Sequence, residues 1–151
     1  MTTQAVLDTM NENTLPFIKM LGGRITAIDA ADQSCTFEFD VSHDFCHSGD
    51  IVQGGFITAM LDAAMSHAVF GLGQDIANVS SLEITTRYLE ATRAGKLIAV
   101  GKVTKGAYKT AFLEGNLYDT EGKLLATTHS VAKLVRGEGG FSNPIPAEAS
   151  A

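Results

Sequence analysis

Apolar and polar residues alternate along two parts of the chain, which predicts β-strands there. The first part holds two alternating segments, residues 22–28 and 35–41, with a turn at residues 30–33 between them. The second part holds four alternating segments that short polar or glycine-containing turns separate: residues 79–90, 95–105, 108–118 and 123–135. Segments of this length and spacing are typical of consecutive antiparallel strands.

Two other segments have a helical pattern. Residues 4–20 show weak helical periodicity, which Pro16 interrupts, and predict a short leading helix and a turn. Residues 53–70 are apolar on almost every side, as expected for a helix that other structure encloses. Residues 42–52 are polar and predict a loop. We therefore expect an α+β fold in which an antiparallel sheet wraps around one long central helix.

The length of 151 residues suits a single domain with one substantial core. We place this domain at residues 1–136, with residues 1–20 as its leading helix. Residues 137–151 contain several glycines and two prolines and predict a flexible tail. The face of the sheet that turns away from the helix would be solvated or would pair subunits.

Charge and cysteine usage narrow the class of protein. The chain has 17 acidic and 11 basic side chains, a net charge of −6, which disfavours a general nucleic-acid binder because such proteins neutralise phosphates with positive charge. Two cysteines, Cys35 and Cys46, give no disulfide framework and indicate a reducing compartment. The N-terminus has no signal-peptide pattern, and Asp62 would cost about 2.5–3.5 kcal/mol inside a membrane. We expect a cytoplasmic protein without membrane partners.

A stripe of polar residues runs along the predicted central helix. Thr58, Asp62 and Ser66 are four residues apart and therefore share one narrow face of an otherwise apolar helix. One interpretation is a solvated polar edge. The other is a catalytic carboxylate, oriented by the hydroxyl one turn further on. His67 lies off this stripe and is interpreted as a packing or surface residue.

The predicted start of the same helix is the second unusual feature. Gln53, Gly54 and Gly55 present backbone N–H groups that no large side chain blocks. Helix N-termini stabilise negative charge, so these groups could bind the oxyanion of a tetrahedral intermediate, although Gly-Gly before a helix also serves tight packing. Gly54 and Asp62 are about 12 Å apart along the helix axis, so one helix cannot supply both to one carbonyl. If both act together, they do so across the two-fold axis of a dimer with two shared sites.

The sequence resembles a known family at these positions. The segment His47-Ser-Gly-Asp-Ile-Val-Gln53-Gly54-Gly55, followed by Asp62, is similar to the motif Asn-x-x-Gly-x-x-His-Gly-Gly with an acidic residue eight positions after the first glycine of the Gly-Gly pair. This motif is typical of the hotdog-fold acyl-CoA thioesterases of the PaaI-like (phenylacetate-degradation, 4-hydroxybenzoyl-CoA thioesterase) type. The resemblance extends over about residues 20–135. His47 replaces the amide residue of the motif, and Gln53 replaces its histidine.

The resemblance implies a role for each motif residue. Asp62 would act as nucleophile or as general base, Gly54 would donate its N–H to the thioester oxygen, and Ser66 would help to hold the attacking water. His47 would orient the water or the carboxylate, next to Gln53. Gly55 and Ser81 would lie beside the substrate. The family further implies an acyl-CoA substrate, no separate cofactor, and a homodimer with shared sites that assembles into a homotetramer, a dimer of dimers.

The basic side chains gather in one part of the chain. Residues 87–109 hold six of them and a single acidic residue. Such a region could attract the phosphates of coenzyme A, and Arg87, Lys105 and Lys109 are the candidates, although solvated strand faces explain them equally well. His43, Cys46, His47 and Asp50 do not have the spacing of a zinc site, so no metal is expected. Two alternatives stay open: a non-catalytic acyl-CoA or ligand-binding protein, and an acyl-thioester hydratase or dehydratase of the same fold.

Overall fold

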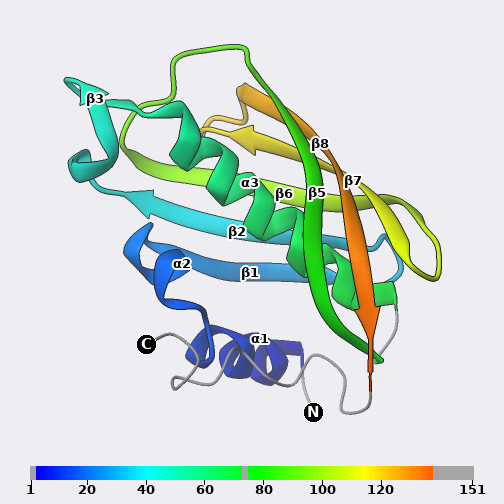
Figure 1. The fold of residues 1–151 in the computed structure, drawn as a ribbon. Helices are drawn as coiled ribbons and strands as arrows, with labels where there is room; N and C mark the ends of the chain where they lie inside the picture. The colour runs from blue at the N-terminus through cyan, green and yellow to red at the C-terminus, as the bar shows by residue number, and fades with distance from the viewer. Residues whose placement is uncertain (1–2, 73–74, 138–151) are drawn as a thin grey trace.

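A computed structural model of the chain describes residues 3–72 and 75–137, and its centre is a curved antiparallel sheet (Figure 1). The sheet has six strands in the order β1-β2-β6-β7-β8-β5. These strands are β1 (Gly23–Asp29), β2 (Ser34–Val41), β5 (Ile76–Tyr88), β6 (Gly95–Gly106), β7 (Thr110–Tyr118) and β8 (Leu124–Arg136). All six lie where the alternating sequence pattern predicts them, with small differences at their ends.

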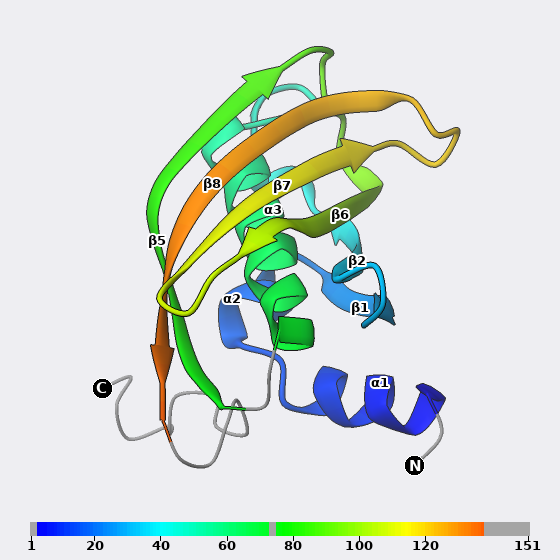
Figure 2. The same cartoon turned by 90° about the vertical axis from the view of Figure 1, so that its right-hand side faces the viewer.

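The long helix α3 (Gly54–Ala68) lies in the concave face of this sheet (Figure 2) and continues into the 3₁₀ turn η2 (Val69–Leu72). Two glycines of the sheet allow the helix to come close. A side chain at Gly101 would collide with the backbone of Ala64, and one at Gly115 would lie 3.1 Å from the Met65 side chain. Met65, like Met60, is completely buried. The predicted α+β hotdog architecture is confirmed, with the sheet curved around one face of the helix.

The N-terminal segment differs from the prediction, because it contains two helices. They are α1 (Thr3–Glu12) and α2 (Pro16–Met20), and Pro16 begins the second helix, where its missing N–H costs no hydrogen bond. The side-chain amide of Asn11 bonds to both backbone groups of Ile25, donating to its carbonyl at 2.9 Å and accepting from its N–H at 2.7 Å. The leading segment thereby covers the β1 edge of the sheet.

The opposite edge of the sheet is bare. No strand among residues 3–72 and 75–137 pairs with the second side of β5. The strand is 13 residues long, and its Leu82 side chain is 65% exposed. Long exposed edges are normally protected or paired, so β5 is a surface where a second chain can add.

The loop prediction for residues 42–52 is wrong in part, since this segment folds into a 3₁₀ turn and a small ribbon. The turn is η1 (His43–Phe45), and the ribbon pairs β3 (Cys46–Ser48) with β4 (Ile51–Val52). Hydrogen bonds to the segment after β5 hold the ribbon in place: Val52 N–H donates to Thr92 and Ala94 N–H donates to Asp50. Residues 138–151 of the predicted tail lie outside the described residues. No helix within the described ranges is long and apolar enough to cross a membrane.

Candidate functional site

The predicted polar stripe of α3 faces the edge strand β5. Near its start, the Thr58 hydroxyl lies 2.8 Å from the hydroxyl of Thr86 and 3.0 Å from that of Tyr88. Further along, Asp62 is half-buried and also bonds to β5. The stripe is therefore a polar contact between helix and edge strand, with the carboxylate of Asp62 as its only charged member.

Two hydroxyl groups hold the Asp62 carboxylate through one of its oxygens. Ser81 donates to Oδ1 at 2.8 Å, and Ser66, one helical turn from Asp62, donates to the same oxygen at 3.4 Å. The second oxygen, Oδ2, accepts no hydrogen bond from the described residues. This arrangement fixes the orientation of the carboxylate and leaves Oδ2 available to a ligand or water.

A β-bulge in β5 explains how Ser81 reaches the helix. Ser81 pairs with Ala132 and Glu83 with Val131, so Leu82 is an extra residue in the ladder. The extra residue shifts the alternation of side chains by one position. Ser81 consequently lies on the helix-facing side of β5, the side that Thr86 and Tyr88 also share.

Asp62 lines a small cavity of about 160 Å³ next to the N-terminal segment. Its walls are mainly apolar side chains, with a few polar groups among them. The lining residues are Leu15, Phe17, Asp62, Ala63, Ser66, His67, Phe70, Asn78 and Val79. We call this space the Asp62 cavity.

The start of α3 has free backbone donors, as the sequence predicts. The first N–H groups that find an acceptor are those of Phe56 and Ile57, both bonded to the Gln53 carbonyl. No described residue accepts from the N–H of Gly54 or Gly55. A side chain at Gly54 would lie 3.0 Å from the Tyr88 ring, whereas Gly55 faces open space. Gly54 therefore serves close packing, and its N–H stays free to bind a ligand.

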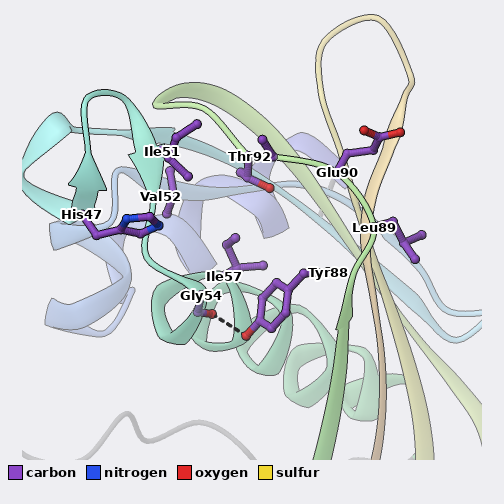
Figure 3. A pocket seen from close by; sticks show the side chains of 10 residues that line it. His47, Ile51, Val52, Gly54, Ile57, Tyr88, Leu89, Glu90 and Thr92 are labelled. Carbon is purple, nitrogen blue, oxygen red and sulfur yellow. Dashed lines mark hydrogen bonds between the residues drawn. The ribbon is translucent and has the colours of Figure 1, made fainter.

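A larger cavity of about 430 Å³ opens at this end of the helix (Figure 3). We call it the His47 cavity. Its lining residues are His47, Ile51, Val52, Gly54, Ile57, Tyr88, Leu89, Glu90, Ala91 and Thr92. The imidazole of His47 is exposed, and its Nδ1 lies 2.8 Å from the Ser48 hydroxyl. The Tyr88 hydroxyl donates to the Gly54 carbonyl at 2.8 Å and so fixes the start of the helix against β5.

The structure divides the motif residues between these two cavities. Gly54 and His47 line one of them, whereas Asp62 and Ser66 line the other. Gln53 caps the helix through its backbone, with no side-chain cap bond, and lines neither cavity. Within one chain, the Gly54 N–H and the Asp62 carboxylate therefore lie in different cavities. This agrees with their expected separation of about 12 Å along the helix axis.

The basic residues proposed from the sequence lie outside both cavities. Arg87, Lys105 and Lys109 are exposed and line neither space. Arg87 follows Thr86 and precedes Tyr88, so it points to the opposite face of β5. Three other basic side chains of residues 87–109 are paired with carboxylates, which reduces the positive field: Arg93 with Asp50 at 2.6 Å, Lys96 with Glu38 at 3.7 Å, and Lys102 with Asp32 at 2.9 Å.

The other candidate groups have structural surroundings. The His67 ring packs edge-on against Phe37 and Phe70, its Nδ1 is 2.8 Å from the Ala63 carbonyl, and burial lowers its pKa. Burial raises the pKa of the Cys35 thiol to about 12, so this thiol stays protonated. Within residues 3–72 and 75–137, no group of three His, Cys, Asp or Glu side chains could hold a metal ion.

Three residues at the site escape sequence reasoning. Tyr88 is 34 positions from Gly54, and Thr92 is even further, so no local pattern links them to the helix. Asp50 stands where the motif has its first glycine, and its ion pair with Arg93 ties the ribbon to the segment after β5.

Known proteins share both the sequence pattern and the fold. The family model of the thioesterase superfamily matches residues 49–126. A phenylacetic acid degradation-related protein from Ralstonia eutropha is 26% identical, with 87% of this chain and 98% of that one covered at a TM-score of 0.76. No curated protein sequence gives a significant match.

Two further structures support the fold. PaaI of Escherichia coli, from the phenylacetic acid degradation operon, is 16% identical over 89% of this chain and 95% of its own, with a TM-score of 0.76. A thioesterase from Haemophilus influenzae is also 16% identical, over 95% and 94% of the two chains, with a TM-score of 0.76. With the family match over half of its length, the chain belongs to the thioesterase superfamily and is a thioester hydrolase with the PaaI-like hotdog fold.

Proposed function

We propose that this protein hydrolyses an acyl- or aryl-CoA thioester to the free acid and coenzyme A. The observation that carries the proposal is the Asp62 carboxylate, which two hydroxyls hold through Oδ1 while Oδ2 faces no protein donor among the described residues. Buried carboxylates are normally paired, and one that lines a cavity with an oxygen left free is a candidate for catalysis. The free N–H of Gly54 supplies the second requirement, a donor for developing negative charge.

The reaction follows from these two groups. Water adds to the acyl carbon while Asp62 takes its proton, or the carboxylate itself attacks that carbon. In both routes the carbonyl oxygen becomes negative, and the Gly54 N–H stabilises it. The carbon–sulfur bond then breaks, and the thiolate of coenzyme A leaves and takes up a proton. In the second route this step gives an anhydride with Asp62, which water then hydrolyses to the free acid and the Asp62 carboxylate. His47 and Ser66 orient the water, and Gly55 and Gln53 leave the approach open.

We infer that two chains build each site. On one chain Asp62 and Gly54 line different cavities, so a second copy must supply the missing partner. The bare edge of β5 offers the surface for it, since antiparallel pairing of two β5 strands would set two α3 helices antiparallel, side by side. Asp62 of one copy would then face the helix start of the other. Pairing of such dimers would give the tetramer expected from the family, and sedimentation analysis distinguishes the two states.

The first experiment measures release of free thiol from a panel of acyl- and aryl-CoA thioesters. Wild type should release thiol from at least one of them, and Asp62→Asn should lose about 10³-fold or more of kcat. Asp8→Asn, an exposed carboxylate on α1, is the control and should keep the wild-type rate. Absence of release from every thioester, or full activity of Asp62→Asn, would contradict the proposal and favour a non-catalytic ligand-binding protein.

A complementation experiment tests the shared site. Gly54→Pro removes the N–H donor at a helix position that tolerates proline, and Asp62→Asn removes the carboxylate. Each variant alone should be inactive. After the two are unfolded together and refolded, half of the dimers are mixed and hold one intact site, so about a quarter of the wild-type activity should return. If the mixture stays inactive although mixed dimers form, each chain must contain its own complete site.

A further inference from the structure

Thr92 carries a buried hydroxyl without a partner at the wall of the His47 cavity. The side chain is only 2% exposed, and no residue of the described ranges bonds its Oγ1. In Figure 3 its oxygen lies on the side toward Ile57 and Tyr88. A buried hydroxyl that makes no hydrogen bond is destabilising, so such groups in native proteins call for an explanation.

The backbone around Thr92 is firmly held, which makes the position of this hydroxyl well defined. The Thr92 carbonyl accepts from Val52 N–H at 2.9 Å. Arg93 bonds to the Asp50 carboxylate at 2.6 Å, and Ala94 N–H donates to the Asp50 carbonyl at 2.8 Å. The hydroxyl therefore stays unpaired although its carbonyl and the two following residues are bonded to the ribbon, as expected of a group that is kept for a ligand.

The cavity around Thr92 favours an uncharged ligand group that can form hydrogen bonds. Its wall combines aliphatic side chains, from Ile51, Val52, Ile57 and Leu89, with polar groups. The lining contains no lysine or arginine that would bind a fully charged group, and its one carboxylate, Glu90, is paired with Lys123 at 3.6 Å. An amide fits these conditions, because it is neutral and presents both a donor and an acceptor.

We propose that Thr92 determines specificity for the thiol half of the substrate by hydrogen bonding to an amide of its pantetheine arm. This inference rests on the proposed function. The His47 cavity has about 430 Å³ against about 160 Å³ in the Asp62 cavity, and exposed residues such as Tyr88 and Glu90 line it. The larger, solvent-facing space suits the long arm, which must lead out to the bulky nucleotide. The smaller one suits the acyl group.

Binding of non-hydrolysable thioethers tests the inference independently of catalysis. The probes are the S-propyl thioether of pantetheine and a propyl thioether whose arm has the same length but no amide. Thr92→Val should raise the Kd of the pantetheine probe about three- to tenfold, because one neutral hydrogen bond is lost, and should leave the amide-free probe unchanged. Thr92→Ser keeps the hydroxyl and should bind both probes within twofold of wild type.

Ser130 provides a matched control for the effect of a buried, unpartnered hydroxyl. It is 4% exposed, its Oγ lacks a partner within the described residues, and it lines neither the His47 nor the Asp62 cavity. Thr92→Val and Ser130→Ala should both keep or raise Tm, since each removes an unsatisfied group. Only Thr92→Val should weaken binding of the pantetheine probe.

Each result has a defined meaning. Unchanged pantetheine binding by Thr92→Val overturns the inference, and so does a lower Tm of this variant, which would show that the hydroxyl has a structural bond. Failure of Thr92→Ser to restore binding overturns it as well. If binding depends on Thr92 but no thioester is hydrolysed, the inference stands and the proposed hydrolysis fails. If Asp62-dependent hydrolysis is found but binding ignores Thr92, only the inference fails.

Discussion

The two cavities along α3 differ in the chemistry that they offer. The His47 cavity has free backbone N–H groups and an exposed imidazole, which stabilise or orient negative charge. The Asp62 cavity has a carboxylate held by two hydroxyls, which can activate water or attack a carbonyl. One helix thus carries two different chemical groups about 12 Å apart, and in the proposed two-chain site they would complement each other between copies.

Both cavities depend on the same strand for their geometry. Tyr88 of β5 fixes the start of α3 at Gly54, and Ser81 of β5 fixes the carboxylate of Asp62. The strand is also the bare edge of the sheet. The element that positions both half-sites is therefore the one on which a second copy would add, which would couple assembly to catalysis.

After Asp62→Asn, the largest effect is expected from removing the N–H donor of the His47 cavity. Gly54→Pro should lower kcat about 10²- to 10³-fold in the homogeneous protein, the usual loss for one oxyanion donor. Gly54→Ala is the matched control, because it brings a similar contact with Tyr88 but keeps the N–H. Thiol release measures both. If the two variants lose activity equally, crowding at Tyr88 explains the loss and the donor role is refuted.

In the Asp62 cavity, the two hydroxyls should differ in importance. Ser81→Ala removes the 2.8 Å bond and should lower kcat about tenfold, as expected for a hydrogen bond to a charged group. Ser66→Ala removes only the 3.4 Å contact, so we expect less than about threefold if orienting Asp62 is its main effect. Steady-state kinetics compare the variants. A larger loss for Ser66→Ala would mean that this hydroxyl acts mainly on the attacking water.

Removing the Tyr88 hydroxyl should have a smaller effect, and it should lower both stability and activity. Tyr88→Phe loses the bonds to the Gly54 carbonyl and the Thr58 hydroxyl, so kcat/KM should fall about three- to fivefold and the free energy of unfolding by about 0.5–1 kcal/mol. Kinetics and urea unfolding measure the two quantities. Tyr108→Phe, at an exposed position, should change neither. A loss of stability with unchanged kinetics would limit Tyr88 to a structural role.

His67, in the wall of the Asp62 cavity, should make the stability of the protein depend on pH. Burial lowers the pKa of His67, so below about pH 6.5 the unfolded chain binds a proton that the folded chain resists. Above that pH, His67 does not reduce the free energy of unfolding. Below it, the free energy of unfolding falls as the pH decreases, by at most about 1.4 kcal/mol per pH unit. His67→Gln should flatten the slope of unfolding free energy between pH 7 and 5.5.

The exposed His129 is the control for this prediction, and His129→Gln should keep the wild-type slope. Equal slopes in wild type and His67→Gln would show that His67 is not the titrating group. Activity at pH 7 should show little change for His129→Gln, because this ring lines neither cavity.

Alternation and helical periodicity were enough to predict most of the fold. The strands and α3 follow patterns that burial of one face imposes on any sequence. The ribbon at residues 46–52 escaped prediction, because its strands are too short for a periodic signal and depend on hydrogen bonds to the Thr92 carbonyl and from the Ala94 N–H. The second N-terminal helix was missed because Pro16 was interpreted as an interruption, although it begins the helix.

The polar stripe of α3 was visible in the sequence because helical spacing alone places Thr58, Asp62 and Ser66 on one face. Ser81 came only from the family resemblance, and its bond to Asp62 depends on the bulge at Leu82, which reverses the alternation of β5. Simple alternation would have put Ser81 on the same face as Arg87. For the same reason, the sequence could not show that Arg87 lies outside both cavities.

The sequence by itself determined the elements, the free donors at the start of α3 and the carboxylate on its polar face, because these depend on local spacing and backbone geometry. Only the tertiary structure decided which strand faces that stripe, that Tyr88 and Ser81 hold the two half-sites, and that Thr92 is buried without a partner. Such contacts join residues far apart in the chain, and they depend on register, bulges and packing that no local pattern records.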